Sequence, residues 1–139
     1  MHGEFGGDLR STSNFTLNRV GRKLLGTSFK GALDAISMPD DDRQTQYVIL
    51  NSRVAPKAGH WVAFYRHDGR LYYYDSFSMP LKHYFKHWGP TPHTQADPSD
   101  REQRSEALGD DTEDENCGIL ALTWLVLIKQ FGLAPAMMI

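Results

Sequence analysis

The sequence predicts an α+β domain in which a mixed central sheet packs against helices, with a cysteine at the start of a buried helix. A run of β-forming apolar residues, Tyr47 to Leu50, is typical of a buried strand. Two further strand-like segments, residues 60–66 and 71–77, flank Asp68-Gly69, and this dipeptide is a strong signal for a β-hairpin. The apolar segment from Cys117 to Ile128 then predicts a helix that is buried on nearly every side.

The first third of the chain holds one predicted helix and one less regular segment. Residues 1–13 are polar and rich in glycine and serine, so we expect them to be flexible. Apolar residues then recur at helical spacing and predict a short helix: Leu17, Val20 and Leu24. Asn14 or Thr16 is the candidate cap of this helix, and Gly26 is its expected stop. The same spacing predicts a second short amphipathic segment, formed by Phe29, Leu33 and Ile36.

The predicted hairpin brings a histidine and an acid together. With Asp68-Gly69 as the turn and no bulge in either strand, Val62 pairs with Asp75. His60 lies on the same face as Val62 because side chains alternate along a strand, and it pairs with Phe77. His60 and Asp75 are then diagonal neighbours about 7 Å apart at their Cα atoms, which allows a hydrogen bond between carboxylate and imidazole.

The second half of the chain is predicted to contain a short helix, a long loop and a long helix. Leu81 to Trp88 is expected to form the short helix, with its aromatic rings clustered. Residues 89–115 contain several prolines and acids and are expected to form a long polar loop, which at such a length is usually functional or mobile. The long helix, from about Cys117 to Phe131, is expected to end at Gly132, with Pro135 beyond it.

Composition narrows the class of protein. The chain of 139 residues fits one domain with one core, so we interpret residues 1–139 as a single domain. With a net charge of -2, the chain lacks the excess of positive charge that is typical of proteins that bind nucleic acid or an anionic membrane. The single cysteine excludes an internal disulfide framework and a four-cysteine zinc site. No apolar run reaches the ~20 residues of a membrane span, and the N-terminus does not resemble a signal peptide. We therefore expect an intracellular soluble protein, or one packaged in a particle.

Cys117 is the candidate nucleophile. It lies where a polar segment becomes a helix, and free N–H groups and the helix dipole at such a junction favour a thiolate. Gly118 follows it and leaves space for a substrate backbone. A thiol, a base and a group that orients the base are the requirements of a cysteine hydrolase, and the sequence offers Cys117, His60 and Asp75 in these roles.

Each of these residues also has an ordinary structural interpretation. Cys117 can be an inert core residue, His60 a satisfied histidine at a strand end, and Asp75 a turn residue. His83 and His87 have the spacing of two metal ligands on one helix face but lack a well-placed third ligand, so we expect neither a metal nor another cofactor. An acidic run before the cysteine is interpreted as a solvated segment that complements the helix N-terminus, or alternatively as a surface that favours basic substrates: Asp110, Asp111, Glu113, Asp114 and Glu115.

Three motifs in order resemble the adenovirus protease (adenain) family and, more distantly, the proteases of ubiquitin-like proteins. They are Gly59-His60-Trp61-Val62-Ala63-Phe64, Tyr74-Asp75-Ser76-Phe77 and Asn116-Cys117-Gly118. The order histidine, acid, cysteine is the order of that group and the reverse of the order in papain, where the cysteine comes first. Two short pieces near the N-terminus also look like the adenain family: Leu25-Gly26-Thr27 and Phe29-Lys30-Gly31. The resemblance covers roughly residues 24–131.

The resemblance implies a circularly permuted papain-like core and a cysteine endopeptidase. Cys117 would attack the peptide carbonyl, and His60 would deprotonate the thiol and later protonate the leaving amine. Asp75 would orient His60; the adenain family has Glu at this place, whereas Asp is usual in the ubiquitin-like group. Trp61 would pack beside the imidazole. The expected substrates are polypeptides, foremost viral capsid or core precursors, and the expected location is the host cell interior and the virion, as a monomer with no membrane partner.

The chain departs from the family at the oxyanion hole. Where the family has a glutamine before the cysteine, this sequence has Asp110 and Asp111, which cannot donate a hydrogen bond when ionised. Either an insertion separates Gln103 from Cys117, so that Gln103 is the donor, or the glutamine role is lost and the Cys117 N–H serves alone. The family also extends further past its cysteine, so contacts with DNA or an activating peptide are not carried over.

Two other functions stay open at this point. A deconjugating protease for ubiquitin-like proteins would use the same chemistry on a different substrate. A non-catalytic binding or structural module would keep the fold without the reaction, and the missing glutamine favours this interpretation.

Overall fold

The computed structural model describes residues 13–53, 59–96 and 116–138. Helices and short 3-10 turns surround one sheet, and the elements follow one another along the chain as α1 (Asn14–Leu25), η2 (Gly26–Ser28), β1 (Phe29–Leu33), β2 (Gln46–Asn51), β3 (Trp61–His67), β4 (Arg70–Tyr74), α2 (Leu81–Tyr84), η3 (Lys86–Trp88), β5 (Thr94–Gln95), α4 (Cys117–Phe131) and α5 (Leu133–Met137). The molecule is therefore an α+β protein, as predicted, and the cysteine begins a helix with a buried face.

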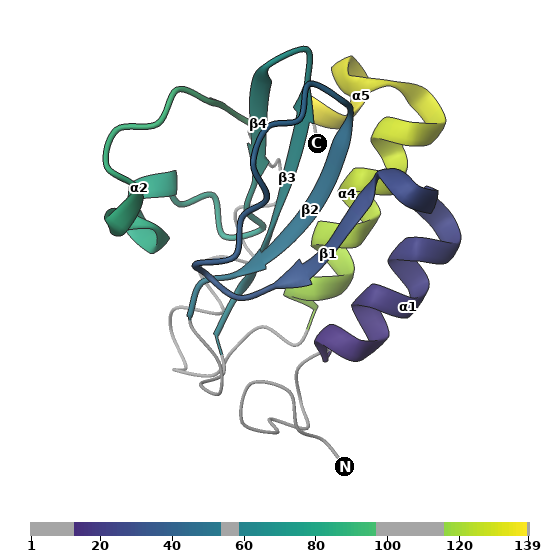
Figure 1. The fold of residues 1–139 in the computed structure, drawn as a ribbon, viewed down its shortest axis with the longest axis horizontal. Coiled ribbons are helices and arrows are strands. Elements are labelled where there is room, and N and C mark those ends of the chain that lie inside the picture. The colour runs from purple at the N-terminus through teal and green to yellow at the C-terminus, as the bar shows by residue number, and fades with distance from the viewer. Residues whose placement is uncertain (1–12, 54–58, 97–115, 139) are drawn as a thin grey trace.

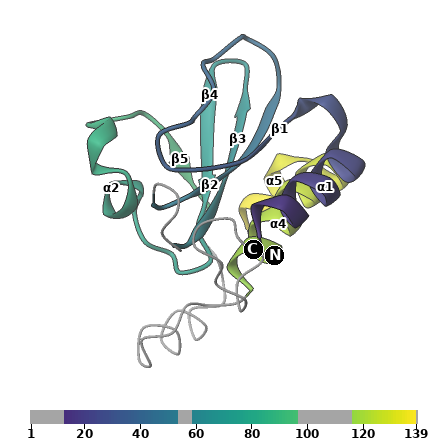
Figure 2. The same cartoon turned by 60° about the horizontal axis from the view of Figure 1, so that its bottom comes forward.

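In the described part of the chain, five strands form one mixed sheet in the order β1-β2-β3-β4-β5. The central strands β2, β3 and β4 are antiparallel to one another, while β1 and β5 pair in parallel with their neighbours. Helices α1, α4 and α5 cover one face of the sheet, and α2 with η3 lies over the other (Figures 1 and 2). Each face has its own apolar core, so successive strand residues, which point to opposite faces, can both be buried.

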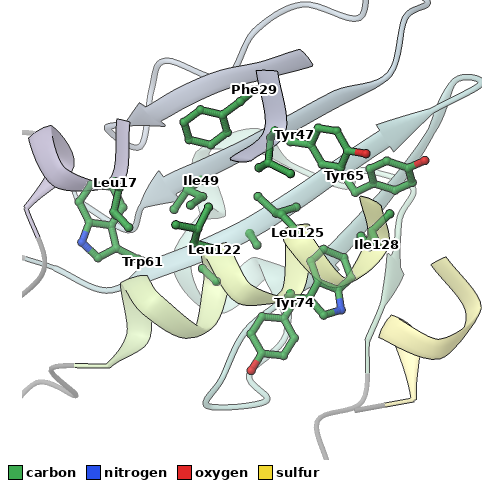
Figure 3. Packing of buried hydrophobic residues seen from close by; sticks show 14 of the residues in the cluster. Leu17, Phe29, Tyr47, Ile49, Trp61, Tyr65, Tyr74, Leu122, Leu125 and Ile128 are labelled. Carbon is green, nitrogen blue, oxygen red and sulfur yellow. The ribbon is translucent and has the colours of Figure 1, made fainter. Parts of the chain in front are cut away.

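Figure 3 shows the larger core, which lies between the sheet and α1, α4 and α5. Side chains such as Leu125 from α4 meet Ile49 from β2 and Tyr74 from β4 there. The Tyr74 ring stacks on Trp124 with centroids 5.4 Å apart. This packing fixes α4 across the sheet, and it thereby fixes the position of the helix N-terminus, where Cys117 lies.

The hairpin prediction is confirmed in its register. Ala63 pairs with Tyr74 and His67 pairs with Arg70, so the turn centre is Asp68-Gly69 and the strands contain no bulge. Both turn residues have positive φ, 54° and 77°, as the Asp-Gly signal requires for this type of tight turn. The ladder ends at Tyr74, so the next residue, Asp75, directly follows the strand.

Four expectations about local structure need correction. Phe29 and Leu33 lie in strand β1, which pairs with β2, and do not form a helical piece. Ile36 lies in the turn after the strand and is 66% exposed, so the helical spacing does not correspond to a buried face. The first helix is capped by Ser13, whose Oγ accepts the Thr16 N–H at 3.2 Å, and not by Asn14 or Thr16.

The other two corrections concern the C-terminal half. The stretch 89–115 is not loop throughout, since Thr94–Gln95 forms β5; residues 97–115 lie outside the described ranges, as do residues 1–12 of the segment expected to be flexible. The segment Leu81 to Trp88 is not one helix, because α2 ends at Tyr84 and the separate 3-10 turn η3 covers Lys86–Trp88. Pro135 lies beyond the end of α4, as predicted, within the short helix α5. The Ala136 carbonyl of this helix accepts the indole N–H of Trp124 at 2.9 Å, which ties α5 to α4. The predicted helix stops at Gly26 and Gly132 are confirmed.

Gly21 lies where α1 packs against β1, and it provides a test of this contact. A Cβ added at Gly21 would lie 2.4 Å from the ring of Phe29, which is itself buried in the larger core. We expect Gly21→Ala to lower the free energy of unfolding by about 1–3 kcal/mol through overpacking. Alanine normally favours a helix over glycine by about 1 kcal/mol, so the expected sign is the reverse of helix propensity. Urea denaturation measures the change.

The matched control for this prediction replaces Phe29 with a smaller side chain. In a Gly21→Ala, Phe29→Leu double variant the clashing ring is gone, so the added methyl group should cost less than it does in the presence of Phe29. A denaturation midpoint for Gly21→Ala at or above that of the wild type would contradict the close packing of α1 on β1.

None of the helices in the described residues is both long and apolar enough to cross a bilayer.

Candidate active site

The three residues of the predicted catalytic group come together at one end of the sheet. His60 directly precedes β3, Asp75 directly follows β4, and Cys117 is the first residue of α4. Because β3 and β4 are antiparallel, the start of one lies beside the end of the other. The N-terminus of α4 reaches the same end, and the Trp61 N–H donates to Cys117 Sγ at 3.4 Å. Three separate elements therefore supply the thiol, the imidazole and the carboxylate.

His60 and Asp75 form a direct hydrogen bond, as the hairpin register predicted. The distance between His60 Nε2 and Asp75 Oδ1 is 2.5 Å. Both side chains are removed from water, with Asp75 0% and His60 8% exposed. A buried carboxylate at hydrogen-bond distance fixes the orientation of the ring. Because Nε2 is engaged by Asp75, Nδ1 is the ring nitrogen left for Cys117.

Asp75 is held by four donors, two on each oxygen. Oδ1 accepts the Phe77 N–H at 3.1 Å in addition to His60, and Oδ2 accepts the Met79 N–H at 2.9 Å and the Tyr84 hydroxyl at 2.8 Å. All the partners donate, so a carboxylate with two accepting oxygens is the side chain that satisfies them. The turn after β4 thus fixes Asp75 through the backbone, while α2 fixes it through a side chain.

The environment of His60 favours its protonated form. Burial by itself lowers the pKa of His60. The hydrogen bonds and electrostatic interactions with Asp75 and Cys117 raise this pKa by more than burial lowers it, so the net value is about 10. His60 is consequently an imidazolium at neutral pH in this arrangement. A positive charge therefore lies next to Cys117.

Two aromatic rings border the imidazole. The His60 ring stacks on Phe77 with centroids 4.1 Å apart and an angle of 13° between the planes, and Tyr84 lies against it at 5.2 Å. The indole of Trp61, which the resemblance implied beside the imidazole, belongs to the larger core on the opposite face of the sheet, together with Leu17 (Figure 3). The Trp61 group that contacts Cys117 Sγ is its backbone N–H and not its indole.

Phe77 and Tyr84 are site residues that the sequence interpretation missed. For Phe77 a signal existed, because the predicted register set it opposite His60, but its ring was not given a role. For Tyr84 no local signal existed. Its contact with Asp75 arises because α2 folds back over the sheet, and that path is not visible in the sequence.

The N-terminus of α4 supplies backbone donors near the thiol. The first helical hydrogen bond of α4 runs from the Leu120 N–H to the Asn116 carbonyl at 2.8 Å. The N–H groups of Cys117 and Gly118 precede this bond and have no acceptor within the helix. The Cys117 N–H therefore stays a candidate oxyanion donor. The other candidate, Gln103, lies outside the described residues, as do Asp110 and Asp111.

No model of a known protein family matches this sequence. A search of curated proteins found no match either. The resemblance to the adenain family accordingly depends on the short motifs around His60, Asp75 and Cys117, and the function implied by it remains a proposal.

The histidines outside this group have no metal-binding arrangement in the described ranges. No three His, Cys, Asp or Glu side chains within those ranges gather in a way that could hold a metal ion, so His83 and His87 find no third ligand there. Cys117, His60 and Asp75 together provide a thiol, an imidazole and a carboxylate. Such a group can attack an acyl carbon and exchange a proton with the leaving group.

Proposed function

We propose that the protein is a cysteine endopeptidase that hydrolyses peptide bonds with Cys117, His60 and Asp75. The observation that carries the proposal is the buried Asp75–His60 pair, joined at 2.5 Å, next to the thiol at the start of α4. A thiol, a base and an orienting acid drawn from three separate elements support catalysis more strongly than any one of them does.

The proposed reaction has two halves. Cys117 Sγ attacks the carbonyl carbon of the scissile bond, and the Cys117 N–H donates to the developing oxyanion. His60 gives its proton to the leaving amine, the C–N bond breaks, and a thioester forms with Cys117. His60 then takes a proton from water, whose oxygen attacks the thioester carbon. The C–S bond breaks, and the products are a carboxylic acid and the Cys117 sulfur as a thiolate next to protonated His60, the state from which Sγ attacked. Asp75 keeps the imidazole oriented and stabilises its positive charge throughout.

The proposed fold relationship is a circularly permuted papain-like core. A mixed sheet that carries the histidine and the acid, packed against a helix that begins with the cysteine, supports it. The family-level substrate class follows from the same resemblance: precursors of viral capsid or core proteins, cleaved in the host cell or in the particle. Deconjugation of ubiquitin-like proteins is the neighbouring possibility, and a panel of fusion substrates with a C-terminal Gly-Gly separates the two.

The deciding experiment measures whether Cys117 is an active nucleophile. At neutral pH the protein should react with a thiol-directed peptide electrophile at least about a hundredfold faster than a free thiol does, because the site activates and positions the sulfur. It should also cleave co-expressed structural precursors of a virus that encodes it. Mass spectrometry locates the adduct, and Cys117→Ala should abolish both the labelling and the cleavage.

A matched control uses the hairpin turn. His67 is exposed at the far end of β3, where its Nδ1 lies 2.9 Å from the Thr45 hydroxyl. His67→Gln should therefore leave labelling and cleavage as in the wild type, whereas His60→Gln should suppress both. Equal effects of the two histidine replacements would contradict the assigned role of His60.

One observation favours the alternative of a non-catalytic module. The Cys117 side chain is buried, at 2% exposed, so a substrate must gain access to the sulfur for any reaction to occur. If Cys117 reacts with the peptide electrophile no faster than a free thiol, the site is structural and the endopeptidase proposal fails.

A further inference from the structure

A hollow of about 600 Å³ opens beside His60, on the face of the sheet that α2 covers. Its described wall comes from two places: Ser52, Arg53, Gly59 and His60, which lie between β2 and β3, and the α2–η3 region. The side chains that matter for its chemistry are Arg53, His60, His83, Tyr84, Lys86 and His87. The hollow is therefore continuous with the catalytic imidazole.

The wall of this hollow is cationic. Arg53 and Lys86 carry full positive charges, His60 is an imidazolium, and His83 and His87 add ring nitrogens that can donate. No carboxylate is among the described residues that line it, and within the described part of the chain neither Arg53 nor Lys86 forms an ion pair. Asp75 lies behind His60, but its two oxygens already accept four hydrogen bonds.

A convergent group of positive charges favours an anion. The charges repel one another when the hollow holds only water, and a carboxylate relieves that repulsion while it accepts hydrogen bonds from the guanidinium of Arg53. A concave wall also removes part of the water that would screen the interaction, so the pairing is stronger here than on a flat surface.

Because the hollow begins at His60, the proposed role of His60 indicates which part of a substrate lies in the hollow. In the proposed reaction His60 protonates the leaving amine, so the residue on the amine side of the scissile bond lies against the imidazole. An extended chain advances about 3.3 Å per residue, so the next one to three residues pass the hollow that begins at His60. The acyl side of the scissile bond lies instead toward Cys117 and the N-terminus of α4.

We propose that this cationic hollow is a specificity subsite for an aspartate or glutamate side chain located one to three residues after the scissile bond. The assignment rests on the proposed endopeptidase function and adds its substrate preference. It is opposite in sign to the preference for basic substrates that the acidic run of residues 110–115 would give. A hollow of this size beside His60 accommodates a peptide side chain, whereas nucleic acid binds extended basic surfaces.

The first experiment measures binding without catalysis. Fluorescent peptides that contain Glu are compared with otherwise identical peptides that contain Gln, by anisotropy with the Cys117→Ala protein at low salt. We expect the Glu peptides to bind about tenfold more tightly, because Arg53 and Lys86 line the hollow and no described carboxylate does. The difference should shrink as salt is added. Equal affinities for the Glu and Gln peptides would overturn the proposal, and so would stronger displacement by a short single-stranded oligonucleotide than by the Glu peptide.

A pair of double variants connects the preference to the hollow. Arg53→Glu, Lys86→Glu should abolish or invert the preference for Glu peptides. Lys23→Glu, Arg70→Glu changes the net charge by the same amount at exposed positions on α1 and at the hairpin turn, and it should keep the preference. All four residues are exposed, and circular dichroism checks that the variants fold. Equal loss in both double variants would mean that net charge, and not the hollow, sets the preference.

The second experiment reads the preference in cleavage. Wild-type protein is incubated with a complex peptide library, and the residues around each new cut are identified by mass spectrometry. Asp and Glu should be enriched one to three residues after the cut. Enrichment of acids before the cut, or of basic residues after it, would contradict the assignment. If the library is not cut at all, the endopeptidase proposal fails, while the binding comparison still decides whether the hollow selects an acidic side chain.

Discussion

Replacing Asp75 with asparagine is expected to lower cleavage activity by about 10²–10⁴-fold, the range that loss of the orienting acid has in triad enzymes. The physical reason is the hydrogen-bond inventory of the site. Four donors converge on the Asp75 oxygens: the His60 imidazole, the N–H groups of Phe77 and Met79, and the Tyr84 hydroxyl. Asparagine offers one oxygen and one NH₂ group, so it turns a donor toward two of these donors. The imidazole then loses both its orientation and its compensating charge.

The same change is expected to reduce stability. Asp75 is fully buried and paired with a charged His60, and removing one partner of such a pair typically costs about 3–5 kcal/mol of the free energy of unfolding. Chemical denaturation measures this loss, and peptide-electrophile labelling of Cys117 measures the activity. Asp75→Glu keeps the charge and both oxygens, so it should recover more activity than Asp75→Asn does.

Tyr84→Phe provides the matched control for Asp75. It removes one of the four donors and keeps the ring that lies against His60, so we expect a smaller loss than with Asp75→Asn in both measurements. An Asp75→Asn protein with wild-type labelling rate and wild-type stability would show that Asp75 is only a turn residue, the ordinary interpretation that the sequence allowed.

The arrangement of the candidate catalytic group was predictable because local signals fix most of its geometry. Asp68-Gly69 sets the turn, the turn sets the register, and alternation along the strands brings His60 and Asp75 to one face. The position of Cys117 next to His60 was not predictable from local signals. It depends on how α4 crosses the sheet, and only the family resemblance, not the spacing of residues, indicated that the thiol would face the imidazole.

The errors of the sequence interpretation also have physical reasons. Phe29 and Leu33 have helical spacing, yet they form β1 because the edge of β2 offers a parallel partner over that length. A two-residue strand such as β5 has no periodicity to detect, and it exists because the chain after η3 returns to β4. Tyr84 and the cationic hollow depend on the same kind of return by α2, which is a tertiary event.

The His60 contribution to stability is expected to fall as the pH rises from about 6.5 toward 10. The hydrogen bonds and charges of Asp75 and Cys117, acting against burial, raise the pKa of His60 from 6.5 to about 10 in the folded protein. In the unfolded chain His60 releases its proton near its ordinary pKa, whereas the folded protein retains it through this window. Counting the His60 proton alone, the folded state binds more protons than the unfolded state, so the His60 contribution to the free energy of unfolding decreases as the pH rises.

The size and the source of this slope can both be measured. One retained proton corresponds to at most about 1.4 kcal/mol per pH unit. The contribution is fully present below pH 6.5 and is lost as the pH approaches 10. Urea denaturation is measured at a series of pH values between about 7 and 9, above the range in which carboxyl groups titrate and below that of tyrosine and lysine. The comparison is made in the Cys117→Ala protein, because there no thiol proton can offset the His60 proton and Asp75 alone remains as a partner. His60→Gln should remove the slope in this background. If Cys117→Ala and the His60→Gln, Cys117→Ala double variant show the same slope, His60 is neutral beside Asp75, and the imidazolium that donates to the leaving amine in the proposed mechanism is absent.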